Sequence, residues 1–380
     1  MKASFDLPAL SELGWTPHFH RQYLGLVSES SELENCVPAR IVADHGSEFE
    51  IAGFGLPRRA VLTGRLAHEL SGMRPCVGDF VLVSPRLDRG PLLIERLFER
   101  SSVFRRKVAN ATSNAQAIAA NVDLAIVVAA FADEGADRHV VQRGLNARRI
   151  ERYLVAVGEA PASAVVVITK ADLRSDAAEQ AALLRQELGT VDIVLTSALS
   201  GQGTDELAQR IGRGISAVLV GSSGAGKSSL VNRLLGKEAQ RVEAVRDADT
   251  RGRHTTTHRE LFVLPNGGLL IDTPGMRELA LYADETTSLG KSGFDDIDAW
   301  AEQCRFRDCL HQGEPGCAVL EAVLRGELSA TRLQHSEKLR RELEWQKQRV
   351  DAAERSAQRK KRRALSRAVR KGMRTKYGSE

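Results

Sequence analysis

Residues 216–235 read SAVLVGSSGAGKSSLVNRLL, and this stretch decides the fold of the central part of the chain. The apolar run 217–220 predicts a short buried strand, and GSSGAGKS at 221–228 follows it directly. That segment matches the phosphate-binding pattern G-x-x-x-x-G-K-[ST] at every fixed position. Apolar side chains then recur at helical spacing, at Leu230, Val231, Leu234 and Leu235. The register of strand, loop and helix predicts a site for a nucleoside triphosphate; a ligand-free glycine-serine turn is the alternative.

The chemistry of this loop follows from its small residues, which let successive backbone N–H groups turn inward around a polyphosphate. The following helix points its positive end at the same anion. We expect Lys227 to reach the β- and γ-phosphates and the Ser228 hydroxyl to bind Mg²⁺. The predicted nucleotide-binding residues of the loop are Gly221, Ser222, Ser223, Gly224, Ala225, Gly226, Lys227, Ser228 and Ser229.

Two segments upstream of the loop indicate the base. Apolar runs at 164–169 and 192–197 predict strands, and both end in polar residues that match the [NT]-K-x-D and S-A patterns of GTPases. A carboxylate at Asp172 can accept hydrogen bonds from N1–H and the exocyclic amine of guanine, a pair that adenine does not offer. A backbone N–H near Ala198 would suit guanine O6. An Asp after a strand is often only a helix cap, so each pattern is weak alone, but together they predict guanine. The predicted residues are Thr169, Lys170, Ala171, Asp172, Ser197 and Ala198.

Downstream of the loop, LLIDTPG at 269–275 contains a D-x-x-G motif. We expect Asp272, at the end of a buried strand, to hold Mg²⁺ through water, and the Gly275 N–H to contact the γ-phosphate. Between the two motifs lies DTRGRHTTT at 249–257, whose hydroxyls suit a switch loop, with Thr256 as the nucleotide ligand. The alternative is a threonine-rich loop that leads into a strand at 260–265.

The order of these motifs is unusual. Most GTPases run phosphate loop, switch threonine, D-x-x-G, base motif and S-A, whereas here 169–172 and 197–198 come first. The order predicts a circular permutation, which an α/β domain tolerates because its ends can be joined elsewhere. As a consequence, the D-x-x-G segment leads straight into the C-terminal part of the chain.

The C-terminal part begins with a cysteine-histidine cluster, Cys304, Cys309, His311 and Cys317. Three thiolates and one imidazole are the ligand set of a closed, tetrahedral structural zinc site, and four protein ligands leave no position for catalysis. Free cysteines are the alternative. So short a segment can bury little apolar surface, so metal binding should supply much of its folding free energy.

The whole chain has 380 residues, enough for two or three domains, with 42% hydrophobic and 27% charged residues. From Arg355 to Glu380 there are eleven Lys or Arg against one Glu, so the net charge of +5 is a property of this tail. We expect no signal peptide, bilayer span or disulfide framework, and a cytoplasmic location. The tail predicts either a solvated extension or an electrostatic contact to nucleic acid.

The N-terminal third predicts a small barrel. Five short strands, broken by Gly, Pro or Asp, fit between residues 37 and 98, which suits a five-stranded OB-fold. The barrel is either structural or a nucleic-acid face to which Arg58, Arg59 and Arg65 supply charge. The aromatic patch 15–23 predicts a segment docked on a neighbouring domain, and Cys36 and Cys76 predict core residues.

With the predicted barrel, the permuted order of the motifs and the cysteine-histidine cluster, the chain resembles the ribosome small subunit-dependent GTPase A family. The resemblance covers roughly residues 36–335 and includes segments 221–229, 254–257, 272–275 and the whole cluster. It implies an α/β fold: a circularly permuted P-loop GTPase domain with an N-terminal OB-fold β-barrel and a C-terminal zinc-binding helical domain. The boundaries that we expect are 1–35 for an extension, 36–105 for the barrel, 106–288 for the GTPase domain, 289–350 for the zinc domain and 351–380 for the basic tail.

The resemblance also implies a function, which is GTP hydrolysis in late maturation of the 30S ribosomal subunit by a monomer that binds rRNA and is stimulated by the small subunit. The implied cofactors are one structural zinc per chain and Mg²⁺ with GTP. Two other readings remain. A permuted GTPase of large-subunit assembly is disfavoured by the barrel with a zinc domain, and a P-loop kinase or ATPase by Asp172 with Ser197 and Ala198.

Two positions depart from common GTPase patterns. Thr169 stands where Asn is usual in the base motif, so a hydroxyl replaces the amide that braces the phosphate loop. Met276 follows D-x-x-G, where many GTPases have a glutamine that orients the attacking water. A thioether cannot serve that way, so His254 or a partner must position the water, and slow intrinsic turnover follows. The predicted catalytic residues are therefore His254, Lys227 and Asp272.

Overall fold

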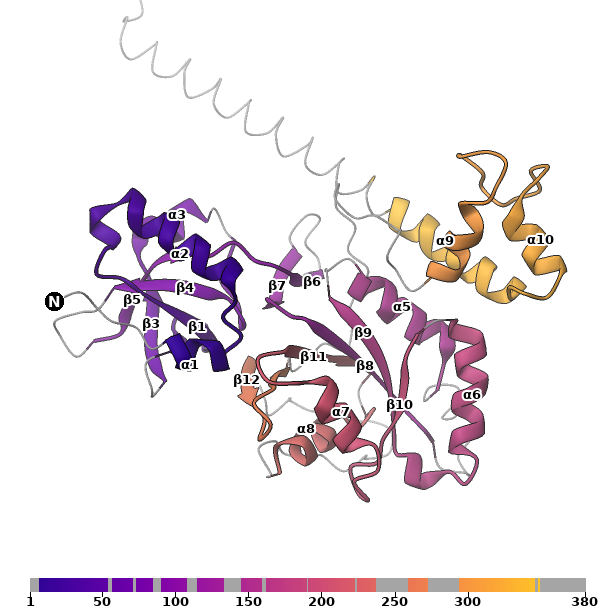
Figure 1. Cartoon of the computed structure of the whole chain (residues 1–380), viewed down its shortest axis with the longest axis horizontal. Helices are drawn as coiled ribbons and strands as arrows, with labels where there is room; N and C mark the ends of the chain where they lie inside the picture. The colour runs from indigo at the N-terminus through magenta and orange to yellow at the C-terminus, as the bar shows by residue number, and fades with distance from the viewer. Residues whose placement is uncertain are drawn as a thin grey trace, which may run out of the picture.

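The computed structural model describes residues 7–53, 57–70, 73–84, 90–107, 115–132, 145–158, 162–189, 191–222, 224–236, 259–272, 294–345 and 348. A β-barrel, a central sheet with helices on both faces, and a C-terminal group of helices follow one another along the chain (Figure 1). No helix within these ranges is long and apolar enough to cross a membrane.

The barrel contains five strands, as the sequence predicted: β1 (Val37–Asp44), β2 (Phe49–Ala52), β3 (Arg58–Leu62), β4 (Phe80–Ser84) and β5 (Leu92–Leu97). Their order is β1-β2-β3-β5-β4, and β4 pairs with β1 to close the ring. Helix α3 (Gly64–Glu69) begins at Thr63, whose side chain accepts a hydrogen bond from the Leu66 N–H. Alternate residues of the strands, such as Ile41, Ile51 and Ile94, fill the interior. The predicted OB-type barrel is confirmed.

The N-terminal segment docks on this barrel, as its aromatic patch predicted. It forms α1 (Leu7–Glu12), α2 (Pro17–Glu29) and the 3-10 turn η1 (Ser31–Leu33). Trp15 lies edge-on to Phe80 and Phe98, with ring centroids 5.1 and 5.4 Å apart, and all three rings are buried. This small core lies on the outer side of β4 and includes Cys36.

The sequence from Ser101 to Asn121 favours a linker after the barrel, but this stretch contains a hairpin of β6 (Val103–Lys107) and β7 (Ala115–Ala120). That expectation was wrong because β7, AQAIAA, is alanine-rich and carries a weak intrinsic strand preference. The strand conformation of β7 depends instead on its pairing with β6 and on burial, since Phe104 and Ile118 pack in the main hydrophobic core.

The central sheet has the order β10-β9-β8-β11-β13-β12. Its strands are β8 (Leu124–Ala130), β9 (Ser163–Thr169), β10 (Ile193–Leu195), β11 (Ser216–Gly221), β12 (Arg259–Val263) and β13 (Leu269–Asp272). The alternation of apolar runs with helical stretches in this part of the sequence predicts a parallel sheet. Five strands are parallel, but β12 runs antiparallel to β13. The reason is the tight turn between them: Gly267, at φ 82°, donates its N–H to Leu264 O, and so short a connection allows only antiparallel pairing.

Helices cover both faces of the sheet, which explains its continuous apolar runs. Helices α5 (Ala147–Gly158) and α6 (Ala177–Leu188) share one core with Val127 and Ala129. Helices α7 (Thr204–Arg210) and α8 (Lys227–Leu235) share the other with Ile126 and Val128. The alternation along β8 assigns successive side chains to opposite faces.

The C-terminal helices are α9 (Asp295–Ala301), α10 (Ala318–Leu324) and a helical segment at 330–345. Buried side chains of this group, including Ile297, Val319 and Leu339, join the core that contains α5 and α6. The C-terminal helices therefore share the core of the central domain, and the expectation of little buried apolar surface concerned only the short cysteine-histidine segment between α9 and α10.

Candidate functional site

The phosphate loop lies at the carboxyl end of β11, between that strand and α8. Gly221, at φ 152°, passes so close to β8 that an added Cβ would lie 2.3 Å from Val128 O. Gly226, at φ 79°, is the cap of α8, and the helix begins at Lys227. Lys227 Nζ donates to Gly221 O at 2.8 Å and to Ser222 O at 2.7 Å, so the ammonium lies over the loop. Strand, loop and helix are arranged as the sequence predicted.

Thr169 connects this loop to the predicted base motif. Its Oγ1 donates to Ala225 O at 2.7 Å and lies 3.2 Å from Ala129 O, and the side chain is buried. A Cβ at Gly226 would lie 3.1 Å from the same Oγ1, so glycine there leaves room for the contact. The hydroxyl thus contacts the loop in the way we attributed to an amide, and the departure from the usual asparagine retains the connection.

The two predicted base segments lie side by side at the ends of adjacent strands. In the parallel pair β9–β10, Ile168 is opposite Leu195, and just beyond it Ala171 N–H donates to Thr196 O at 3.1 Å. Asp172 lies in the 3-10 turn η2 (Ala171–Leu173), which follows Lys170 at a left-handed φ of 60°.

The S-A segment after β10 is fixed by its own hydrogen bonds. Ser197 is fully buried, its Oγ accepts from Ser200 N–H at 3.1 Å, and its N–H donates to Gln202 O at 3.0 Å. Its carbonyl accepts from Gly201 N–H at 2.9 Å. The structure therefore brings Thr169–Asp172 and Ser197–Ala198 to one edge of the sheet.

Asp272 ends β13, the neighbour of β11, in a register that places Ile271 opposite Val218. It therefore lies at the same edge as the phosphate loop, where ligands bind in open α/β sheets. The other predicted residues of this edge, Ser223, His254, Thr256, Gly275 and Met276, lie outside the described residues.

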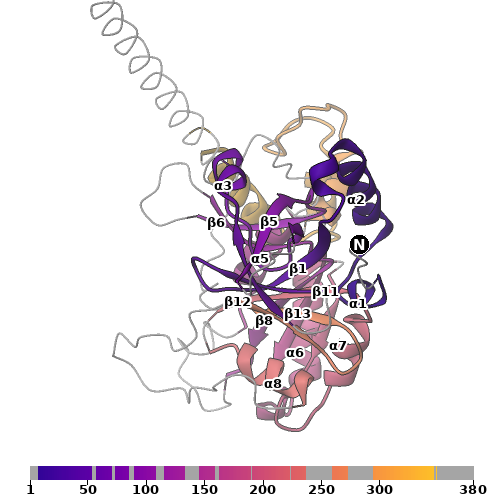
Figure 2. The ribbon, with the colours of Figure 1, turned by 90° about the vertical axis from the view of Figure 1, so that its left-hand side faces the viewer.

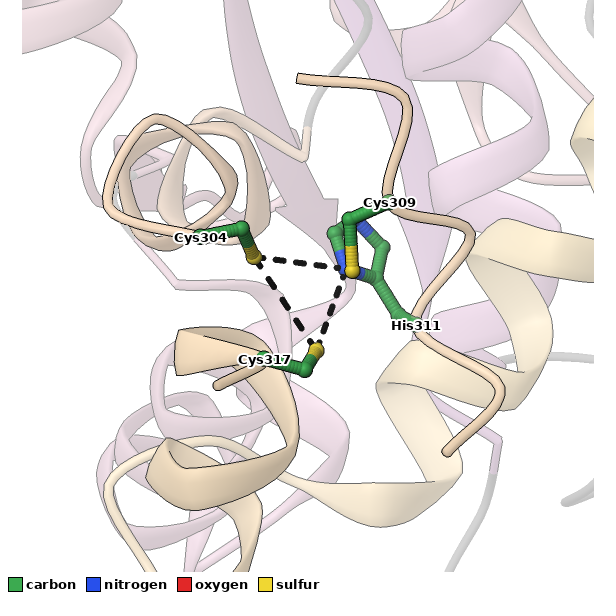
Figure 3. A group of neighbouring side chains, drawn as sticks. All are labelled: Cys304, Cys309, His311 and Cys317. Atoms are coloured by element: carbon green, nitrogen blue, oxygen red, sulfur yellow. Dashed lines mark hydrogen bonds between the residues drawn. The ribbon is translucent and has the colours of Figure 1, made fainter. Parts of the chain in front are cut away.

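The cysteine-histidine cluster forms a second site, far from the first in sequence (Figure 3). Cys304 follows α9 and Cys317 caps α10, while Cys309 and His311 come from the loop between them. Nδ1 of His311 lies 3.4 Å from Cys317 Sγ and 3.7 Å from Cys304 Sγ, and the two sulfurs are 4.0 Å apart. The four ligand atoms all lie within 4.8 Å of one another, which is the spacing of a metal-binding group.

The electrostatics of the cluster suit a cation. Burial lowers the pKa of His311, with a contribution from Arg340, and this favours the neutral imidazole that binds metals. Burial and the neighbouring Cys317 and Cys304 thiols raise the pKa of Cys309 to about 12. A metal cation would favour ionisation of the Cys309 thiol at neutral pH. The four residues could hold a metal ion, and four protein ligands would leave no open coordination position for catalysis.

A buried ion network, which the sequence did not indicate, attaches the C-terminal helices to α5. Arg332 is 4% exposed and donates to both oxygens of Asp296 at 2.7 Å and to Glu151 Oε1 at 2.7 Å. Glu151 also pairs with His335, and the Arg332 guanidinium lies 4.8 Å from the Phe294 ring centroid. Arg332 and Glu151 are 181 residues apart, so no local sequence pattern predicts the contact between them.

A second buried arginine, Arg40, joins the barrel to the phosphate-loop strand. Its guanidinium donates to Leu13 O at 2.6 Å, Gly78 O at 3.0 Å, Asn121 O at 3.1 Å and Ser216 Oγ at 2.9 Å. Burial lowers the pKa of Arg40 to about 10, still far above neutrality, so the group stays charged. One side chain thus holds the N-terminal segment, the barrel, the hairpin and the start of β11.

A phosphate loop, the D-x-x-G strand and the two other GTPase segments meet at one edge of a sheet whose motif order is rotated. The fold and this edge define a circularly permuted P-loop GTPase. The family model for the RsgA GTPase matches residues 97–282. The chain belongs to this family of GTP-hydrolysing proteins, as its resemblance implied.

Relatives in this family match nearly the whole chain. A small ribosomal subunit biogenesis GTPase RsgA from Opitutus terrae is 39% identical over 352 residues, covering 90% of this chain and 92% of that protein. A protein of the same name from Xanthomonas axonopodis is 40% identical, covering 89% of each. Among solved structures, YjeQ from Thermotoga maritima aligns with a TM-score of 0.61 at 28% identity, covering 81% of this chain and 98% of that one. YloQ, described as a circularly permuted GTPase, aligns with a TM-score of 0.57 at 25% identity.

Proposed function

We propose that this protein hydrolyses GTP as a late maturation factor of the small ribosomal subunit, and that the small subunit stimulates hydrolysis. The observation that carries the proposal is the 39% identity, over about nine-tenths of both chains, with a protein named for small-subunit biogenesis. The barrel, the GTPase sheet and the cysteine-histidine cluster support it, because all three parts occur in the order that the resemblance implied.

At the nucleotide site we assign roles by chemistry. Asp172 accepts hydrogen bonds from the N1–H and amine of guanine, with the Ala198 N–H on O6. Lys227 stabilises the charge of the phosphates, Ser228 and Asp272 serve the Mg²⁺ that accompanies GTP, and His254 orients water. The remaining nucleotide contacts are those expected of the phosphate loop, Lys170, Thr256 and Gly275.

At the second site we propose one structural zinc ion held by Cys304, Cys309, His311 and Cys317. The donor set carries this assignment, since three thiolates and an imidazole at tetrahedral spacing select zinc in structural sites. When bound, the ion supplies a cross-link between α9 and α10 and no reaction chemistry.

Contact with rRNA is proposed for the barrel and the basic tail of a monomeric, cytoplasmic protein. Arg58, Arg59 and Arg65 are exposed on β3 and α3. The tail from Arg355 lies outside the described residues, and its eleven basic residues suit phosphate contacts. Deleting residues 355–380 should lower subunit affinity and flatten its salt dependence, measured by cosedimentation at several salt concentrations. An unchanged slope would leave the tail without a role in binding.

The deciding experiment compares steady-state GTP hydrolysis by the full-length protein alone, with purified small subunits and with purified large subunits. We expect the small subunit to raise the rate about 10³–10⁵-fold, because a partner can complete an incompletely equipped site. His254→Ala should remove most of the stimulated rate and leave GTP binding nearly intact. Equal stimulation by both subunits, or stimulation by large subunits only, would favour the role in large-subunit assembly instead.

A further inference from the structure

The barrel and the GTPase sheet are joined strand to strand. The end of β1 pairs antiparallel with the start of β12, with Ala43 opposite Glu260 and Asp44 opposite Arg259 (Figures 1 and 2). On its other side β12 pairs with β13, and there Glu260 is opposite Asp272. A single residue of β12 therefore separates the barrel from the aspartate of the D-x-x-G motif.

One carboxylate, that of Asp44, holds both sides of this junction. Its Oδ1 accepts from Gly46 N–H at 3.0 Å and from Arg74 Nη2 at 2.7 Å. Its Oδ2 lies 3.9 Å from Arg259 Nη1. The Asp44 side chain is 9% exposed and that of Arg259 is 16% exposed, so both charges lie where solvent screens them weakly. Gly46 belongs to the turn between β1 and β2, so the Asp44 carboxylate contacts both this turn and β12.

Arg74 gives the turn further contacts. Arg74 also donates to Gly46 O, and its guanidinium lies 4.9 Å from the centroid of the Phe49 ring. A displacement of this turn would therefore also act on Asp44 and Arg74, which are hydrogen-bonded to it. The strand that an ion pair connects to this turn is β12, through Asp44 and Arg259. This strand begins two residues after Thr257, the last residue of the predicted switch segment.

We infer that Asp44 is a positioning residue for GTP hydrolysis, which through Arg259 and β12 couples the β1–β2 turn of the barrel to Asp272. The inference rests on the proposed function, because it makes the barrel turn the place where a docked small subunit acts on the GTPase site. Asp44 touches neither nucleotide nor metal in this scheme. It sets where β12, and with it the strand that ends in Asp272, lies relative to the barrel.

The test is a set of full-length variants assayed for GTP hydrolysis over a range of GTP concentrations, alone and with saturating purified small subunits. Asp44→Asn keeps an acceptor for Gly46 N–H and removes the charge; Arg259→Gln removes the cation. We expect both to keep KM for GTP and subunit cosedimentation within about twofold, while the stimulated kcat falls at least about fivefold. Arg259→Lys, which restores a cation opposite Asp44, should recover most of the stimulated kcat.

The control is Arg210→Gln, which removes a guanidinium that pairs with Asp192 and Glu206 at a more exposed position on the opposite edge of the sheet. It should leave the stimulated kcat unchanged. A native stimulated kcat in Arg259→Gln, with the subunit fully bound, would overturn the inference and leave the proposed function standing.

A second readout separates the two proposals if the native protein shows no stimulation at all. Amide hydrogen exchange of residues 259–263 reports on the junction without any ribosomal subunit. With a non-hydrolysable GTP analogue bound, these amides should exchange several-fold faster in Asp44→Asn than in the native protein. Equal exchange would overturn the inference, whereas faster exchange without stimulation would support the coupling and reject the proposed function.

Discussion

The phosphate loop and the cysteine-histidine loop are both short stretches that gather a ligand set, but different forces hold them. The phosphate loop is fixed by buried β11, by α8, by the Thr169 hydroxyl and by its own Lys227. In the cysteine-histidine loop, Phe306 and Leu310 are exposed by 42% and 52%, and His311 sits at a left-handed φ of 61°. The comparison teaches that buried strands and helices position the phosphate loop, whereas the exposed cysteine-histidine loop has little packing of its own and should depend on the proposed ion.

Removal of the metal should have the largest effect, and it should affect the cysteine-histidine loop without affecting the nucleotide site. We expect chelation, or Cys309→Ala, to remove hydrogen-exchange protection from residues 304–317 while the nucleotide site still binds GTP. Structural zinc in small domains carries an apparent binding free energy of about 10–16 kcal/mol, far more than this loop can recover from packing. The helix at 330–345 should stay protected, because its buried side chains share the central core.

The control for this experiment is Cys36→Ala, which removes a buried thiol from the barrel side and should leave the metal content unchanged. Metal analysis of the native protein that finds no zinc, with residues 304–317 fully protected, would contradict the prediction.

The phosphate loop should respond in the opposite way, by losing activity without losing its fold. Lys227→Ala should lower kcat/KM for GTP by about 10²–10³-fold, since a charge that faces the phosphates in the transition state is removed. The thermal midpoint should change little, because the Lys227 ammonium donates to the Gly221 and Ser222 carbonyls of the loop itself rather than to a distant element. Lys338→Ala, on the exposed face of the C-terminal helix, is the matched control. Loss of the folded state in Lys227→Ala would show that the loop is not preformed.

A smaller effect is expected when Asp172, the residue predicted to bind the guanine base, is substituted. Asp172→Asn should shift preference from GTP towards xanthosine triphosphate by about 1–3 kcal/mol, because the amide donates where the carboxylate accepted. Competition binding with both nucleotides measures the shift. Asp176→Asn, four positions on and paired with Arg174, should leave the preference unchanged. Equal affinity of the native protein for GTP and ATP would count against the assignment of Asp172 to guanine recognition.

The smallest effect should come from Thr169. Thr169→Val removes the hydrogen bond to Ala225 O and should raise KM for GTP about three- to tenfold, which corresponds to roughly 1 kcal/mol for a buried hydrogen bond. Thr169→Ser keeps the hydroxyl and should keep the native KM. Identical KM values for the Val and Ser variants would show that the hydroxyl does not support the loop.

Much of the fold was predictable because its signals are local. Five short strands were predicted between residues 37 and 98, and further strands at 164–169, 192–197, 217–220 and 260–265, and the structure has strands in all of these places. The direction of β12 was predictable in principle from the Pro265-Asn266-Gly267 turn, which allows only a hairpin. The β6–β7 hairpin was not, because an alanine-rich strand is defined by what it pairs with rather than by its own pattern.

The sequence by itself determined the two ligand sets, because a phosphate loop and a zinc-type cluster are spacing patterns within about twenty residues. Only the tertiary structure decided how the parts are connected: Arg40 on Ser216, Arg332 on Glu151 and Asp44 on Arg259. The physical reason is that a buried charge must find its partners in space, and those partners can come from any part of the chain. The pairing of Arg40 with Ser216 spans 176 residues, a separation at which neither periodicity nor spacing carries information.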